Sequence, residues 1–192
     1  MDKFKYVKTV VGKLIGFYRK EYGLPADDFL IGKGNHYQEL CKNCKKCDKP
    51  ELICSRATLY RLEKGNIVNN ECIYHRIAEK LNKSVILDNH SIYNKLLKYR
   101  ELLVESLVDY SRTQLEKINA EISFDMIKYK NVLYINEILN LYNDIIQCIL
   151  YKNSVANKNS KIYESLLNIV AEEDKKLIIF LFLCLLEVNL KV

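Results

Sequence analysis

Apolar side chains recur at helical spacing along most of the chain, which predicts an all-α fold. The first stripe covers residues 6–22 and is followed by Gly23, a residue type that commonly ends helices. Further helices are predicted over residues 56–64, between a serine N-cap and a glycine, and over residues 70–82. The interval between the first two helices is different, because it begins with a short acidic segment at Pro25 and then becomes rich in glycine and cysteine.

The chain after residue 65 keeps the helical pattern and contains no glycine or proline, so polar clusters have to separate its helices. These are predicted over residues 91–118, 120–130, 131–152, 160–172 and 174–191. We expect stacked antiparallel helical hairpins, a TPR-like array, although no 34-residue repeat can be traced position by position. A polar group at residues 88–91 separates the two predicted domains, a head at residues 1–87 and a helical body at residues 91–192.

Positive charge is concentrated in the predicted head. Residues 1–86 contain 17 Lys and Arg against 10 Asp and Glu, whereas residues 87–192 contain 13 against 14. A basic segment of this kind is typical of proteins that bind a polyanion, and DNA or RNA is the commonest one. Solvated surface lysines are the alternative interpretation.

The predicted helix at residues 56–64 divides its side chains in a way that suits the DNA major groove. Leu59 and Leu62 fall on the side that would pack against the preceding helices. On the other side, arginine can pair with both acceptors of a guanine edge, small residues allow close approach, and lysine meets phosphates. The candidate DNA-binding residues are Ser55, Arg56, Ala57, Thr58, Tyr60, Arg61 and Lys64. An ordinary amphipathic surface helix would show the same division.

Two segments of the head resemble the Cro/repressor (Xre-type) helix-turn-helix family. They are VGKLIGFYRKEYGL at residues 11–24 and ICSRATLYRLEKG at residues 53–65, whose ending LYRLEKG is the more specific. The resemblance implies a DNA-binding transcriptional regulator with a helix-turn-helix head. It also implies that Glu63 is a structural residue paired with Arg19, and that base or phosphate contacts come from Arg56, Ala57, Tyr60 and Arg61.

Within that family, the Ile-Cys-Ser start of the second segment resembles the Gram-positive peptide-sensing (Rgg-like) branch. Proteins of that branch have all-helical C-terminal domains that bind short peptides and control dimerisation. The resemblance therefore implies a homodimer that binds double-stranded DNA and responds to a peptide or small-molecule effector. A two-fold protein of this kind reads a palindromic site.

The spacing between the two segments departs from the family pattern. About twenty additional residues lie between Leu24 and Ile53, which predicts an insertion at about residues 32–52. If the insertion lies inside helix 2 of the motif, the support of the recognition helix is changed. If it lies beside helix 2, the head is intact and carries an additional segment.

The insertion contains three cysteines at C-x2-C-x2-C spacing, and a fourth follows seven residues later. Thiolates at this spacing can converge on one ion, and four of them complete a tetrahedral zinc site. The candidate metal ligands are Cys41, Cys44, Cys47 and Cys54, with His36, Cys72 and His75 in reserve. An iron–sulfur or thiol redox sensor and unligated cysteines are the alternatives, and disulfides are not expected in a reducing compartment. Cys148 and Cys184 fall in apolar helical stripes and are interpreted as core residues.

Other classes of protein are not favoured by the sequence. It contains no phosphate-binding glycine loop, zinc-protease helix or nucleophile elbow, and its histidines are not spaced as a catalytic set, so we do not expect an enzyme. We expect a cytoplasmic protein without a membrane partner, because no signal peptide is visible and the longest apolar run has ten residues. Two alternative functions remain. One is a zinc- or redox-sensing regulator that uses the Cys41, Cys44 and Cys47 cluster, and the other is a helical interaction protein whose head does not bind DNA.

Overall fold

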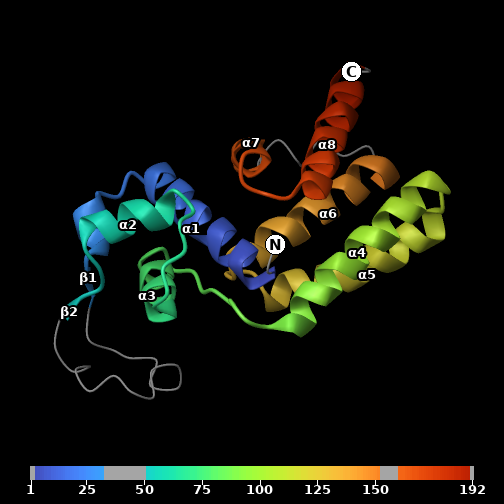
Figure 1. Ribbon diagram of the computed structural model, residues 1–192. Coiled ribbons are helices and arrows are strands. Elements are labelled where there is room, and N and C mark those ends of the chain that lie inside the picture. Colours follow the sequence, from blue (N-terminus) through green and yellow to red (C-terminus); the bar gives the residue numbers. More distant parts are fainter. Residues whose placement is uncertain (1–2, 33–50, 152–159, 191–192) are drawn as a thin grey trace. The chain divides into compact units, whose positions relative to one another are not determined.

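The computed structural model describes residues 3–32, 51–151 and 160–190 (Figure 1). Helices dominate this part of the chain, which confirms the all-α class. The chain divides into two compact units. Residues 1–88 together with residues 131–134 form the first unit, the head, and residues 89–130 and 135–192 form the second unit, the body. None of the helices in the described residues has the length and apolar content needed to cross a bilayer.

Three α-helices and one short 3-10 turn build the described part of the head. They are α1 (Lys3–Glu21), η1 (Ala26–Phe29), α2 (Arg56–Glu63) and α3 (Glu71–Lys80). Their buried side chains form one core, to which α1 contributes a stripe that includes Val7, Val10 and Leu14. Phe29 of η1 and Tyr74 of α3 are also fully enclosed. Burial of these apolar stripes fixes α2 against α1.

Two glycines of α1 allow the backbone of α2 to come unusually close. A Cβ atom at Gly12 would lie 2.4 Å from the carbonyl oxygen of Leu62, and a Cβ atom at Gly16 would lie 2.9 Å from Cβ of Glu63. Any larger residue would push the two helices apart. Gly65 then ends α2 with a φ of +84°, a conformation that suits glycine.

A two-stranded antiparallel pair lies between η1 and α2. Strand β1 (Ile31–Gly32) pairs with β2 (Glu51–Leu52), and Ile31 is the partner of Leu52. The pairing continues where the amide of Ile53 donates to the carbonyl of Leu30 at 2.6 Å. This strand pair joins the described residues on the two sides of residues 33–50. Among the described residues between α1 and α2, the one helical element is the short turn η1, which precedes β1.

The head is completed by a segment from much later in the chain. Residues 131–134 form a parallel bridge to Ser84, whose amide donates to the carbonyl of Asn131 at 2.8 Å. The carbonyl of Ser84 in turn accepts from the amide of Leu133 at 2.9 Å. Tyr134 packs its ring edge-on against Tyr6 of α1, with 6.1 Å between the ring centres. These contacts hold the end of the head in place.

The body consists of five described helices. They are α4 (His90–Val108), α5 (Arg112–Lys128), α6 (Ile135–Tyr151), α7 (Ser160–Leu167) and α8 (Glu172–Leu190). Neighbouring helices pack in the pairs α4–α5, α5–α6, α6–α8 and α7–α8. The predicted first helix at residues 91–118 is wrong, because the chain turns at residues 109–111, where Tyr110 has a φ of +50°.

Buried tyrosine–aspartate pairs connect the helices of the body. In each pair the phenol donates to a carboxylate that is almost completely enclosed, and each pair joins two different helices. The pairs are Tyr99–Asp125 (3.0 Å), Tyr142–Asp174 (3.3 Å) and Tyr163–Asp144 (2.5 Å). Two cations add to them, with Lys95 on Asp125 at 2.6 Å and Arg100 on Asp174 at 3.6 Å. Buried carboxylates need such partners.

Candidate nucleic-acid interface

Helix α2 is short but well capped. Ser55 has extended backbone angles, and its hydroxyl accepts from the amide of Thr58 at 3.2 Å, which satisfies one of the free amides at the helix start. Leu59 and Leu62 are buried against α1. The other side of the helix is left to solvent. The sequence therefore dictates both where this helix begins and which side it buries.

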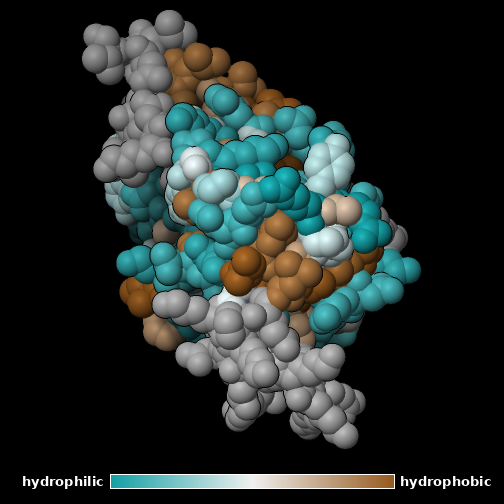
Figure 2. All heavy atoms as spheres, turned by 90° about the vertical axis from the view of Figure 1, so that its left-hand side faces the viewer, coloured by the Kyte–Doolittle hydropathy of each residue, from teal (hydrophilic) through white to brown (hydrophobic). Residues whose placement is uncertain are grey.

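The structure brings the candidate DNA-binding residues together on that solvent side. Six of them are exposed and Thr58 is half-buried; the exposed ones are Ser55, Arg56, Ala57, Tyr60, Arg61 and Lys64. Figure 2 shows the molecule from the side on which α2 and the strand pair lie in Figure 1; hydrophilic side chains cover much of this face, and a compact hydrophobic patch lies near its centre. The exposed apolar side chains of the strand pair are Ile31 and Leu52.

Arg19 and Glu63 form a two-pronged ion pair between α1 and the end of α2. Nε of Arg19 donates to Oε1 of Glu63 at 2.5 Å, and Nη2 donates to Oε2 at 2.9 Å. Nη1 of Arg19 also donates to the carbonyl of Leu24 at 3.0 Å. The hydrogen bond that Arg19 donates to Glu63 raises the pKa of Arg19. Because both side chains are largely buried, this pair fixes the position of α2 relative to α1 and to the following turn.

Arg56, the first residue of α2, is paired with Asp27 of η1. Its Nε donates to Oδ1 of Asp27 at 2.6 Å, and its Nη2 donates to Oδ2. Both side chains are more than half exposed, so this pair stands at the surface. Spacing alone does not predict this pair, because the two residues are 29 positions apart in the chain. The one local signal in the sequence is the acidic segment after Pro25, which contains Asp27.

The remaining exposed side chains of α2 support one another more weakly. Nη2 of Arg61 donates to the hydroxyl of Thr58 at 3.3 Å, one turn earlier. The ammonium of Lys64 lies 5.5 Å from the ring centre of Tyr60, within the range of a cation–π contact. These contacts keep the cations extended along the exposed side of the helix. They would give way easily to a phosphate or a base edge.

The candidate metal ligands are only partly within the described structure. Cys41, Cys44, Cys47 and His36 lie outside the described residues. Cys54 is a free, buried thiol of the head core, and burial raises its pKa, which disfavours the thiolate that zinc requires. No group of three potential ligands occurs among the described residues.

Cys72 is disulfide-bonded. The expectation that the cysteines would stay reduced is therefore wrong for this residue. Cys72 and His75, the reserve ligands on α3, are both half-buried. Burial lowers the pKa of His75. In the body, Cys148 is buried and Cys184 half-buried, and neither forms a disulfide.

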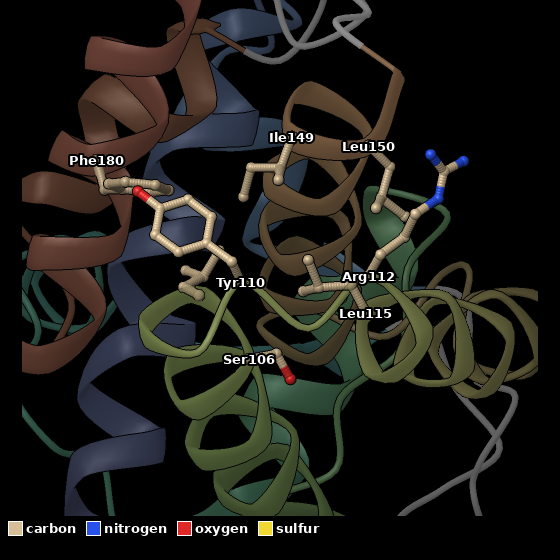
Figure 3. A pocket seen from close by; sticks show the side chains of 8 residues that line it. Ser106, Tyr110, Arg112, Leu115, Ile149, Leu150 and Phe180 are labelled. Atoms are coloured by element: carbon tan, nitrogen blue, oxygen red, sulfur yellow. The ribbon is translucent and has the colours of Figure 1, made fainter.

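A separate cavity of about 280 Å³ lies within the body (Figure 3). Its wall is mainly apolar and is formed by the end of α4, the following turn, α5, α6 and α8. In Figure 3 the rings of Tyr110 and Phe180 lie on one side, Ile149 lies above, and the guanidinium of Arg112 lies at the edge next to Leu150. Arg112 forms an exposed pair with Glu116 at 2.9 Å. The cavity thus combines an apolar interior with one cation at its rim.

No protein-family model matches the chain. Comparisons with curated proteins and with solved structures likewise find no match. The interpretation of the exposed side of α2 therefore depends on its own geometry and chemistry.

Proposed function

We propose that this chain is a sequence-specific DNA-binding transcriptional regulator in which α2 enters the major groove. The observation that carries the proposal is the division of α2 into a side clamped on α1 and a side that offers three cations. Leu59, Leu62 and the Arg19–Glu63 pair hold the helix. Arg56, Arg61 and Lys64 stand free of the core on the exposed side. A short, rigidly supported helix with this chemistry is what base-edge readout requires.

The proposal is tested by measuring the binding of the full chain to fluorescent duplex DNA over a range of salt concentrations. Affinity should fall steeply and linearly on a logarithmic salt scale, because phosphate-bound cations release counterions. The double variant Arg56→Ala/Arg61→Ala should lose at least about tenfold in affinity. Arg112→Ala is the matched control, since Arg112 is an equally exposed arginine in an ion pair of the body.

Two results would count against the proposal. If wild type binds no duplex at low salt, the chain is better described as a helical interaction protein whose head does not bind DNA. If the α2 double variant and the Arg112→Ala control bind equally well, DNA contacts lie elsewhere on the molecule.

The proposal includes a homodimer, because a two-fold protein reads both halves of a palindromic site. Helix α8 offers a surface for a second copy. Ile179, Leu183 and Leu186 are 51%, 59% and 58% exposed and recur at helical spacing. No charged residue occurs between residues 177 and 186, so two copies of this face can meet without like-charge repulsion.

The cavity of the body favours a second element of the proposal, a small-effector site. An apolar interior with one cation at its rim suits a molecule that has an apolar chain and a carboxylate. At roughly 30 Å³ for each water-sized group, 280 Å³ holds about nine such groups. The carboxylate would replace Glu116 as the partner of Arg112, an exchange that is inexpensive because the existing pair is exposed.

Heptanoate, a carboxylate with roughly nine non-hydrogen atoms, is a suitable probe of this site. It should raise the melting temperature of the full chain in a concentration-dependent manner, because a ligand that binds only the folded state stabilises it. Arg112→Gln should weaken that effect, whereas Lys117→Gln, which removes an exposed charge from the same helix, should not. An equal response in both variants would show that the rim cation does not select the ligand.

A further inference from the structure

The ion pair between Arg56 and Asp27 leaves the arginine with a defined set of free donors. A guanidinium has five N–H donors arranged in a planar fork. Asp27 takes the Nε donor and one Nη2 donor with its two carboxylate oxygens. Both Nη1 donors and the second Nη2 donor remain. They lie on the end of the fork that does not face Asp27.

The end of the fork is the edge that fits a guanine. In the major groove, guanine presents O6 and N7 as two neighbouring acceptors, and no other base edge has this arrangement. One Nη1 donor and one Nη2 donor match them. Arg56 is also the first residue of α2, and the N-terminal residues of a recognition helix are the ones that meet base edges.

Among the described residues, the side-chain partner of Asp27 is Arg56. A carboxylate facing DNA is repelled by phosphates, so an aspartate at the interface is unfavourable unless it orders a partner. The Asp27–Arg56 pair contributes little to stability, since both side chains are exposed. What it does provide is orientation, because a two-pronged contact restricts the rotation of a long, flexible side chain.

We propose that Asp27 is a positioning residue that holds Arg56 ready to read one guanine in each half-site. This inference depends on the proposed DNA-binding function and makes it more specific. The arginine supplies both hydrogen bonds to the base, and the aspartate contacts only the arginine. Sequence preference at that one position then depends on a residue that does not touch the DNA.

The test is selection of bound sites from a randomised duplex library by the full-length chain, followed by affinity measurements on the selected site and on copies with the guanine replaced. Wild type should prefer guanine by about tenfold to a hundredfold at one position per half-site. Asp27→Asn should lose most of that preference while its affinity for random duplex stays equal or rises, because a negative charge is removed. Arg56→Lys, which keeps the charge but lacks the fork, should lose the same preference.

Asp28→Asn is the matched control, because Asp28 is an exposed aspartate next to Asp27 on the same turn. It should change random-duplex affinity in the same direction and leave the guanine preference intact. A guanine preference that survives Asp27→Asn overturns the inference but leaves DNA binding standing. Absence of duplex binding by wild type overturns both the positioning role and the proposed DNA binding. If Asp27→Asn and Asp28→Asn lose the guanine preference equally, the cause is a general charge effect, which overturns the positioning role alone.

Discussion

Two arginine–carboxylate pairs of the head have the same chemistry and different surroundings. Arg19 and Glu63 are 15% and 10% exposed at their side chains, and their contact joins the ends of two helices. Arg56 and Asp27 are 72% and 57% exposed. A partly buried pair is costly to break because the remaining charge is left without a partner, whereas an exposed pair is exchanged with water at little cost. The first therefore acts in folding, and the second is available for recognition.

Glu63→Gln should destabilise the head. The substitution removes the charge and one of the two strong acceptors of Arg19, which stays in its half-buried position. We expect a loss of roughly 1.5–3 kcal/mol in the free energy of unfolding, measured by urea denaturation. Glu79→Gln, on the exposed side of α3, is the control and should stay within about 0.5 kcal/mol of wild type. Equal stability of the two variants would contradict the structural role of Glu63.

Tyr99 should make the body sensitive to alkaline pH. Burial and the hydrogen bond to Asp125 together raise the pKa of Tyr99 to about 12, although the contact with Lys95 opposes the shift. The folded state thus holds this proton more tightly than the unfolded state does, for which the pKa is 10.0. The corresponding stability is fully present below pH 10 and is lost as the pH rises toward 12.

The measurement is the free energy of unfolding at several pH values between 9 and 12. Wild type should lose stability over this range at up to about 1.4 kcal/mol per pH unit from this one group. Tyr99→Phe should be less stable at neutral pH and should have a shallower slope. A slope unchanged in Tyr99→Phe would show that other groups dominate the alkaline response.

The contact between α1 and α2 depends on a close approach that larger residues do not allow. Gly12→Ala should therefore lower the free energy of unfolding by about 1–3 kcal/mol, despite the better helix propensity of alanine. It should also weaken duplex binding, because α2 would shift away from α1. Gly23→Ala is the comparison. Gly23 has a φ of +64° and open space around it, so alanine there should cost about 1 kcal/mol without changing DNA binding.

Sequence patterns predicted best where local chemistry decides the structure. The Ser55 cap, the buried leucines of α2 and the glycine after it are all local signals, and the observed helix agrees with them. The break between α4 and α5 was missed, because no glycine marks it and Tyr110 adopts its left-handed conformation within an otherwise helical pattern. The signal present was the pair Asp109 and Ser111, which flanks the turn.

The tyrosine–aspartate pairs of the body could not be predicted from spacing alone. Asp125 and Asp144 stand in helices whose polar positions normally face solvent, and their partners lie 26 and 19 residues away. Only the packing of helices reveals that the carboxylates point inward. The same limit applies to the partner of Arg56, since a contact between residues 29 positions apart leaves no periodic trace.

At the scale of the whole molecule, the proposed homodimer gives a direct test of α8. Leu183→Glu places a charge in the middle of the exposed apolar face and should shift the chain toward a monomer in light scattering. Duplex affinity should fall with it, because two linked heads bind more tightly than one. Val108→Glu is the control, as Val108 is an exposed apolar residue at the end of α4. The proposed interface would be contradicted if wild type were a monomer, or if the Leu183→Glu variant remained a dimer.

The return of residues 131–134 to the head has a consequence for how such a protein can be rebuilt or recombined. A gene fragment that ends at residue 88 encodes a head whose Ser84 backbone and Tyr6 ring have lost their partners. The head therefore cannot be moved to another protein as one continuous stretch of sequence. A chimera that keeps the head intact must also carry the four-residue segment between two helices of the new body, so we expect head and body to evolve together.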